Sequence, residues 1–136
     1  MSHIAVSTIL FYKNDVSKKF IQFIVPSLID YVVSTQDQVT LIITNNAPDN
    51  DVSSIVDLAN QLNQDKKITI KFLDHRENVG FSKGHNLAFQ STPSDYFLLI
   101  NNDLFITEPH WLEKMLTHLA EEKVAWVGAT NSPRIL

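Results

Sequence analysis

The sequence contains no cysteine, which excludes disulfide bonds and thiolate metal sites. It also has no excess of basic residues, because 11 lysines and arginines stand against 15 acidic residues and the net charge is −4 at pH 7. Such a chain has no general attraction for nucleic acid. Its longest apolar runs are about five or six residues, whereas a membrane-spanning helix needs about 20. We therefore expect no nucleic-acid partner and no membrane span.

The remaining composition is that of an ordinary globular domain. Hydrophobic residues make up 44% and charged residues 19% of the 136 positions, which argues against disorder and is enough for one core. No basic segment precedes the first apolar run, and no small-residue cleavage site follows it. We expect one soluble domain over residues 1–136 with a cytoplasmic location.

Short apolar runs rich in β-branched residues alternate with stretches of helical periodicity. This order predicts an α/β fold, Rossmann-like, in which a mainly parallel sheet carries helices on both faces. Pro26 lies inside the first helical pattern and should kink or split that helix. Thr107-Glu108-Pro109 is typical of a helix start. The expected strands are 4–11, 39–44, 68–73, 96–100 and 124–127, and the expected helices are 16–31, 52–62, 82–90 and one that follows Pro109.

Polar residues follow each of the first four expected strands, at the edge where open parallel sheets bind ligands. Any one of these clusters could consist only of turn residues, but four together favour a polar ligand. Asp103 follows an almost wholly apolar strand, and a carboxylate held there suits a hard divalent cation that prefers oxygen ligands. By chemistry alone Asp103 could equally cap the next helix. The clusters are 12–15, 45–51, 74–80 and 101–103.

Residues 78–86 form a strand-to-helix turn that contains two of the 3 glycines. Glycine there allows a positive φ or a close approach of the backbone to a ligand, and a helix N-terminus favours phosphate. The spacing is neither a dinucleotide-binding fingerprint nor a P-loop. Among the large aromatic side chains we expect Phe81, Trp111 and Trp126 in the core. His85 should approach a ligand only because its loop does.

Several segments together resemble family 2 glycosyltransferases. Residues 78–86 (Asn-Val-Gly-Phe-Ser-Lys-Gly-His-Asn) are similar to the family's Asn-x-Gly-Phe-x-x-Gly-x-Asn segment. Leu-Ile-Asn-Asn-Asp at 99–103 resembles the Leu-Asn-Pro-Asp form of the D-x-D motif in rhamnosyltransferase-like members. Residues 9–14 and 42–47 resemble the family's first two strand ends, and residues 111–112 and 127–129 also occur where the family has similar ones. The resemblance covers the whole chain in the right order.

The resemblance implies the donor-binding half of a GT-A fold, in which a nucleotide-diphosphate sugar lies beyond the strand ends. It implies that the metal ligand is Asp103, that the cation is Mg²⁺ or Mn²⁺, and that Asn101 assists. It also implies inverting transfer to a saccharide or lipid-linked acceptor in cell-envelope polysaccharide biosynthesis, with the full-length protein at the inner membrane face. The implied donor-binding residues are Phe11, Tyr12, Asn14, Asn45, Arg76, Asn78, Gly80, Lys83, Gly84, Asn101 and Asn102.

The chain departs from the family pattern at two positions and in its length. Asn45 stands where members have an Asp that binds the base, and Asn101 replaces the first carboxylate of the D-x-D motif. Family 2 catalytic domains are longer, and their general base lies in the part absent here. We therefore expect a truncated domain with little or no transfer activity, whose uncovered apolar surface favours a homodimer.

Two other interpretations remain open at this point. One is a non-catalytic domain that binds a nucleotide or a protein partner. The other is an unrelated doubly wound protein such as a receiver domain, for which Asp74 could supply the single acidic residue after the third strand. The residues after the first strand, Tyr12, Lys13 and Asn14, do not provide the acidic pair that a receiver needs.

Overall fold

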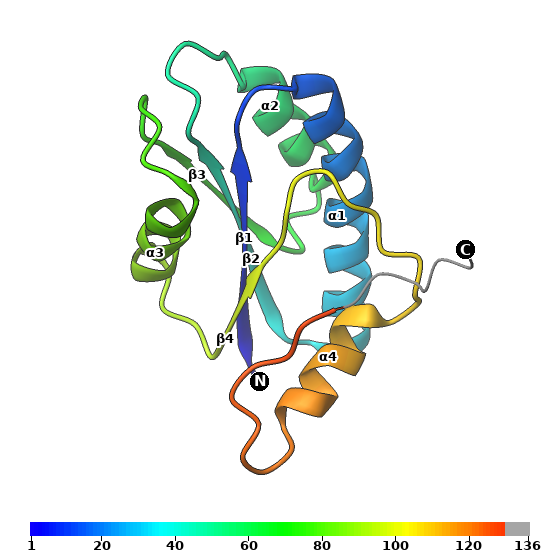
Figure 1. Cartoon of the computed structure of the whole chain (residues 1–136). Coiled ribbons are helices and arrows are strands. Elements are labelled where there is room, and N and C mark those ends of the chain that lie inside the picture. The colour runs from blue at the N-terminus through cyan, green and yellow to red at the C-terminus, as the bar shows by residue number, and fades with distance from the viewer. Residues whose placement is uncertain (130–136) are drawn as a thin grey trace, which may run out of the picture. The chain divides into compact units, whose positions relative to one another are not determined.

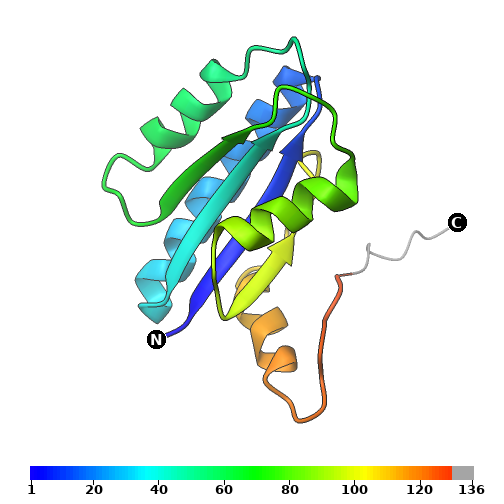
Figure 2. The same cartoon turned by 90° about the vertical axis from the view of Figure 1, so that its left-hand side faces the viewer.

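The computed structural model describes residues 1–129 and divides the chain into two compact units, Met1–Phe105 and Ile106–Leu136. The first unit contains a four-stranded sheet in which every neighbouring pair is parallel. Figure 1 shows it nearly edge-on, and Figure 2 looks onto one face with the strands in the order β3-β2-β1-β4. The strands are β1 (His3–Leu10), β2 (Gln38–Asn45), β3 (Thr69–Asp74) and β4 (Tyr96–Leu99).

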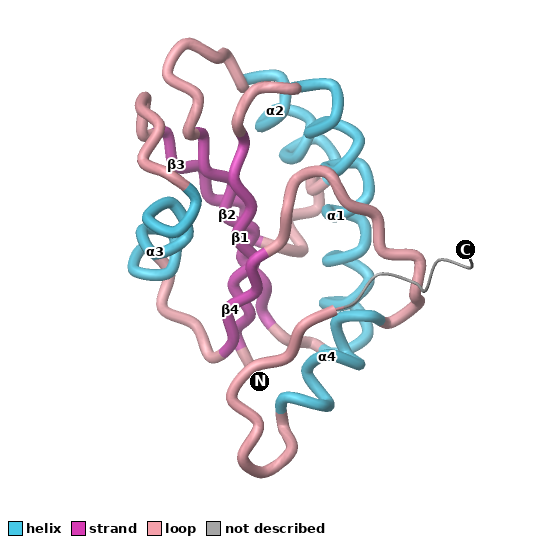
Figure 3. Tube along the Cα trace, viewed as in Figure 1, coloured by secondary structure: helices cyan, strands magenta, loops and turns pink. Residues whose placement is uncertain are grey.

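Three helices of this unit cover the two faces of the sheet. Figure 1 shows α1 (Asn14–Thr35) and α2 (Ser53–Leu62) on one face, and α3 (Phe81–Ser91) on the other. Figure 3 shows the strands as a central layer between helices. The predicted α/β fold with a parallel sheet and helices on both faces is therefore confirmed.

Both faces of the two central strands are buried, which explains their near-continuous apolar sequence. On the α3 face, Ala5 and Ile42 pack with Ala88, and Phe97 and Leu73 complete the cluster. On the other face, α1 contributes residues spaced four apart, so that they form one stripe of the helix. This stripe contains the fully buried Phe20, Ile24 and Leu28.

Of the two outcomes predicted for Pro26, a kink or a split, the split does not occur, since α1 is continuous over 22 residues. A proline inside a helix removes the hydrogen bond to the carbonyl group four residues earlier, here that of Gln22. Both Pro26 and Gln22 are exposed. We infer that water hydrates the freed carbonyl group, while the buried residues on the opposite face hold the two halves of the helix together.

The second unit contains the helix α4 (Trp111–Leu119), which begins two residues after Pro109. The fifth strand expected at 124–127 is wrong, because this segment has no regular secondary structure. Trp111 is buried as expected, but Trp126 is 83% exposed and is not a core residue. Within residues 1–129, no helix has the length and hydropathy to cross a membrane.

Candidate functional site

The turn after β1 places two aromatic rings at the carboxyl edge of the sheet. Tyr12 and Lys13 both have left-handed backbones, with φ of 58° and 52°, which is unusual for residues other than glycine. The rings of Phe11 and Tyr12 make an edge-to-face contact with centroids 4.8 Å apart, and both side chains remain exposed. A strained turn that keeps apolar rings in solvent is typical of a functional rather than a structural segment.

Amide side chains connect the turns that follow β1, β2 and β3. Asn14 and Asn50 exchange two hydrogen bonds: Asn14 Nδ2 donates to Asn50 Oδ1 (3.2 Å), and Asn50 Nδ2 donates to Asn14 Oδ1 (2.7 Å). Asn45 is buried, and its Nδ2 donates to the Asn50 carbonyl oxygen and to Asp74 Oδ1, both at 3.3 Å. Its Oδ1 accepts the N–H of Ala47 (3.1 Å). The side chain of Asn45 is therefore occupied within the chain itself.

Asn46 fixes the glycine turn that opens α3. Its Nδ2 donates to the carbonyl oxygen of Gly80 (3.0 Å), and Gly80 has a φ of 87°, which favours glycine. Gly84 allows α3 to approach the sheet closely, since a Cβ there would lie 2.8 Å from Ile9 Cδ1 and 3.2 Å from Asn46 Nδ2. The two predicted glycines thus position the first turn of α3 against β1 and the end of β2.

This close approach brings His85 onto the sheet. His85 is only 3% exposed, and its Nδ1 lies 2.8 Å from Oγ of the buried Ser7. The ring of Phe81 stands edge-on to it, with centroids 4.5 Å apart. Burial lowers the pKa of His85 below its ordinary value of 6.5, because the charged form loses hydration. His85 is therefore a neutral hydrogen-bonding group at pH 7.

The chain leaves β4 in a polar turn. Asn102 Nδ2 donates to Oγ of Ser17 (2.7 Å), a fully buried residue of α1, so that the turn is fastened to the other face of the sheet. Asn101 and Asp103 are exposed on either side of it. Ile100 continues the parallel pairing by donating its N–H to the Ser7 carbonyl oxygen (3.0 Å).

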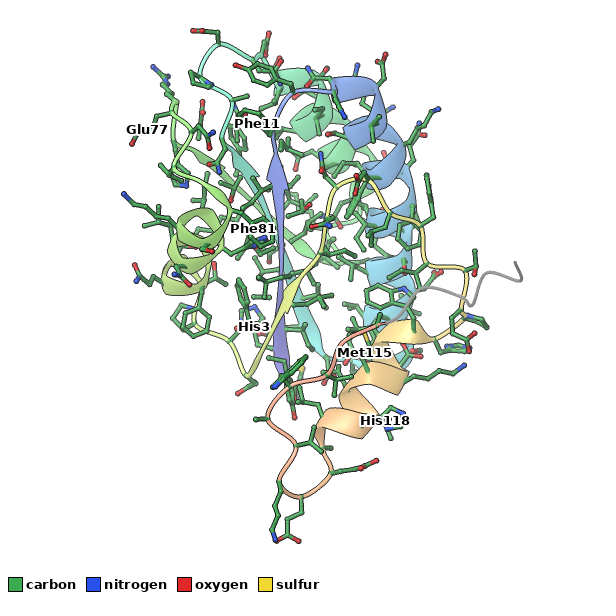
Figure 4. All side chains as sticks on the ribbon, in the orientation of Figure 1. His3, Phe11, Glu77, Phe81, Met115 and His118 are labelled. Atoms are coloured by element: carbon green, nitrogen blue, oxygen red, sulfur yellow. The ribbon has the colours of Figure 1, made fainter. Side chains whose placement is uncertain are left out.

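A pocket of about 310 Å³ opens where these turns meet, at the carboxyl ends of the strands. Figure 4 labels Phe11 near the end of β1 and Phe81 beside the sheet at α3. Phe81 is 58% exposed, so the expectation that it fills the core is wrong. The lining residues are Ile9, Phe11, Asn46, Asn78, Gly80, Phe81, His85, Ile100, Asn101 and Asn102.

Comparison with known proteins now adds to this geometry. The sequence profile of "Glycosyl transferase family 2" matches residues 7–133, most of the chain. The chain belongs to glycosyl transferase family 2. This excludes the receiver-domain interpretation. A comparison with curated protein sequences finds no match.

Among solved structures, this family 2 chain is similar to a mannosyltransferase from Pyrobaculum calidifontis, in complex with GDP-Man and Mn²⁺. The TM-score is 0.72 and the sequence identity 12%, so the similarity concerns the fold. It covers 88% of this chain but 32% of the mannosyltransferase, and the chain thus spans about a third of that protein's length.

The pocket of this family 2 chain includes only some of the predicted donor-binding residues. Tyr12 lies beside it in contact with Phe11, and Gly84 packs beneath it. Arg76 is exposed and faces Asp74, with 3.8 Å between Nε and Oδ2. Asn14 and Asn45 are held in the amide network, and Lys83 is exposed on α3. The predicted residues that line the pocket are Phe11, Asn78, Gly80, Asn101 and Asn102.

Asn46 and His85 also line the pocket, although neither is among the donor-binding residues that the resemblance implies. The Asn45-Asn46 pair was recognisable as a strand end, but alternation along a strand does not show which of two adjacent side chains faces a ligand. His85 lies one residue after Gly84 in the segment that carries the family resemblance.

The residues of this chain can hold a divalent cation only if a bound ligand supplies further coordinating atoms. Asp103 offers one exposed carboxylate, and the neighbouring Asn101 offers an amide oxygen, both of the oxygen type that Mg²⁺ and Mn²⁺ prefer. Within residues 1–129, however, no group of three or more His, Cys, Asp or Glu could hold a metal ion. The residues therefore suit a cation that takes its remaining ligands from a diphosphate and water.

Proposed function

We propose that this chain binds a nucleotide-diphosphate sugar at the carboxyl edge of its sheet and supplies the donor site of a glycosyltransferase. The observation that carries the proposal is the pocket, which combines exposed aromatic rings with amide side chains in a chain of this family. The bound GDP-Man and Mn²⁺ of the mannosyltransferase with the same fold support it.

The chemistry of the pocket suits a nucleotide. Phe11 and Phe81 provide apolar surface for a flat heterocycle, and aromatic side chains stack readily on bases. The turn at Asn78 and Gly80 leads into the N-terminus of α3, where backbone N–H groups favour phosphate. The amides of Asn101 and Asn102 can bond to neutral hydroxyl or phosphate groups.

Asp103, assisted by Asn101, would hold Mg²⁺ or Mn²⁺ together with the diphosphate. When bound, the metal supplies Lewis acidity to the departing diphosphate. The chain's own residues bind and orient the donor, while Phe81 and Phe11 shield the base from water. No residue described in the structure is assigned as general base.

The proposed reaction is transfer to a saccharide or lipid-linked acceptor with inversion. The acceptor hydroxyl oxygen forms a bond to the anomeric carbon as the bond from that carbon to the diphosphate oxygen breaks. The electron pair of the broken bond leaves with the diphosphate, and the hydroxyl proton passes to a base. We propose that the part of a family 2 enzyme that is not in this chain supplies that base, and that the full protein serves cell-envelope polysaccharide synthesis.

Calorimetric titration of UDP, dTDP and GDP, with and without Mn²⁺, tests the donor site. We expect one of them to bind in a metal-dependent manner. Asp103→Ala should reduce the affinity measured with Mn²⁺ by about tenfold or more, the effect of losing about 1.4 kcal/mol. Asp57→Ala is the matched control, because it removes the same charge from an exposed position on α2, away from the pocket.

The titration has outcomes that contradict the proposal. If none of the three nucleotides binds with Mn²⁺ present, the donor site is refuted and the chain is better described as a partner-binding domain. If Asp57→Ala weakens binding as much as Asp103→Ala, the loss is not specific to Asp103 and its assignment as the metal ligand is refuted. Transfer of sugar to a defined acceptor by the purified 136-residue chain would contradict the assignment of the base to another part of the enzyme.

A further inference from the structure

The side chain of Asn45, which the family resemblance implies as a donor-binding residue, is hydrogen-bonded within the chain itself. Both N–H groups of the Asn45 side chain donate, to the Asn50 carbonyl oxygen and to Asp74 Oδ1, and Asn45 Oδ1 accepts the Ala47 N–H. Asn45 is only 2% exposed and does not line the pocket. A base that bonded to Asn45 would have to break the network that joins the turns after β2 and β3.

The neighbouring Asn46 differs from Asn45, because it lines the pocket and only its Nδ2 has a hydrogen-bond partner among residues 1–129. The Gly80 carbonyl oxygen can only accept, so the atom of Asn46 beside it must be Nδ2, and this fixes the orientation of the amide. Its Oδ1 is buried and has no hydrogen-bond partner among residues 1–129. Asn46 is the one residue lining the pocket that has such an atom. An unpaired buried acceptor is costly, and a ligand that brings an N–H group relieves that cost.

His85 lies in the same pocket with one ring nitrogen already used. Its Nδ1 is held by Ser7 Oγ at 2.8 Å, which leaves Nε2 as the ring atom for a ligand. The Ser7 hydroxyl can donate or accept, and therefore Nε2 of the neutral ring can accept from a ligand or donate to it. The edge contact with Phe81 and the close packing at Gly84 hold the ring in one place.

We infer that Asn46 and His85, rather than Asn45, recognise the base of the bound nucleotide. The inference rests on the proposed donor site. The Asn46 carbonyl oxygen requires an N–H group on the base, and His85 Nε2 contacts the adjacent ring nitrogen or carbonyl oxygen. The rings of Phe11 and Phe81 provide the apolar surface for the base itself.

Base analogues separate this recognition from binding of the diphosphate. The nucleotide that binds among UDP, dTDP and GDP is compared by calorimetry with its ring-N-methylated derivative and with inorganic pyrophosphate, all with Mn²⁺. Wild type should bind the methylated nucleotide about tenfold or more weakly, as expected when a buried polar group stays unpaired. Asn46→Ala should abolish that preference.

His85→Phe keeps a ring in the pocket and provides a second measurement should Asn46→Ala fold poorly. It should weaken the parent nucleotide by about fivefold or more, the loss expected for one hydrogen bond, and leave pyrophosphate unchanged. Gln90→Ala is the matched control, because it removes an exposed amide from α3 outside the pocket. It should behave as wild type.

The outcomes distinguish the inference from the proposed function. If wild type binds a nucleotide and the variants keep its preference over the methylated form and over pyrophosphate, the donor site stands and the role of Asn46 and His85 is refuted. Equal weakening of nucleotide and pyrophosphate would also refute it, since the two residues would then affect the shape of the pocket and not the recognition of the base. If wild type binds no nucleotide, the inference and the proposed function are both wrong.

Discussion

The reciprocal amide pair of Asn14 and Asn50 should contribute measurable coupling energy to stability. The two side chains lie 36 positions apart and join the start of α1 to the turn after β2. Asn14 Nδ2 also donates to the Asp51 carbonyl oxygen (3.1 Å). The pair thus joins the turn that presents Phe11 to the turn that presents Asn46.

The size of the coupling follows from counting bonds. Asn14→Ala removes three hydrogen bonds and Asn50→Ala removes two, and the two reciprocal bonds belong to both sets. Each is worth about 0.5–1.5 kcal/mol net, and these side chains are half-buried, so about 1 kcal/mol or less per bond is appropriate. The double variant loses the shared bonds only once. It should therefore be less destabilised than the two single variants together by about 1–2 kcal/mol.

Urea unfolding of the wild type, both single variants and the double variant measures this coupling. The free energies of unfolding are comparable only if the four m-values agree, since a changed m-value indicates a changed denatured or native state. Additivity of the two single effects within about 0.3–0.5 kcal/mol would refute the reasoning, because independent sites add to that degree. In that case the turns are held by backbone contacts and not by the amide pair.

Two further predictions concern buried and charged groups outside the pocket. Thr8 is fully buried, and its Oγ1 has no hydrogen-bond partner among residues 1–129. Thr8→Val should therefore raise the free energy of unfolding, measured by urea titration, by about 1 kcal/mol. A loss of stability would show that the hydroxyl is paired. The hydroxyl of Tyr31 and the N–H of Ser2 hold the pKa of Asp37 below its ordinary value of 3.8. A lowered pKa in the folded state stabilises the fold above pH 3.8 and ceases to do so as the pH falls through the folded-state value. Asp37→Asn should therefore lower the melting temperature at pH 7 and have a progressively smaller effect as the pH falls below 3.8, and an effect that stays constant down to acidic pH would contradict the charge-based explanation.

Much of the fold could be predicted because the sheet is buried on both sides. Strands β1 and β2 have apolar sequences that only a parallel sheet covered by helices explains, and their predicted ranges were correct to within one residue at each end. Val124–Val127 has a similar composition, yet it forms no strand. A short apolar run shows that a segment could be a strand, but a strand also needs a paired neighbour, which composition does not reveal.

The sequence predicts where in the fold the candidate site lies better than it predicts which side chains line it. The topological rule that ligands bind beyond the strand ends located the pocket, and the glycines located the turn into α3. The hydrogen-bond partners were not predictable, because they depend on which side each asparagine faces after its strand ends. Asn45 faces the turns after β2 and β3, whereas Asn46 faces α3 and the pocket.

The abundance of asparagine at this edge has a consequence for binding. Amides at positions 14, 45, 46 and 50 connect the turns without adding negative charge. The residues that line the pocket include no carboxylate, which limits the repulsion of a diphosphate, and Asp103 is the single carboxylate of the segment 99–103. One exposed carboxylate cannot hold a divalent cation tightly in water, where the ion keeps its hydration shell.

If the proposed function is correct, metal and nucleotide must therefore strengthen each other's binding. Thermodynamic linkage requires that Mn²⁺ raises the affinity for the nucleotide by the same factor by which the nucleotide raises the affinity for Mn²⁺. Titrating Mn²⁺ alone should give no measurable heat, whereas titrating it into the nucleotide complex should.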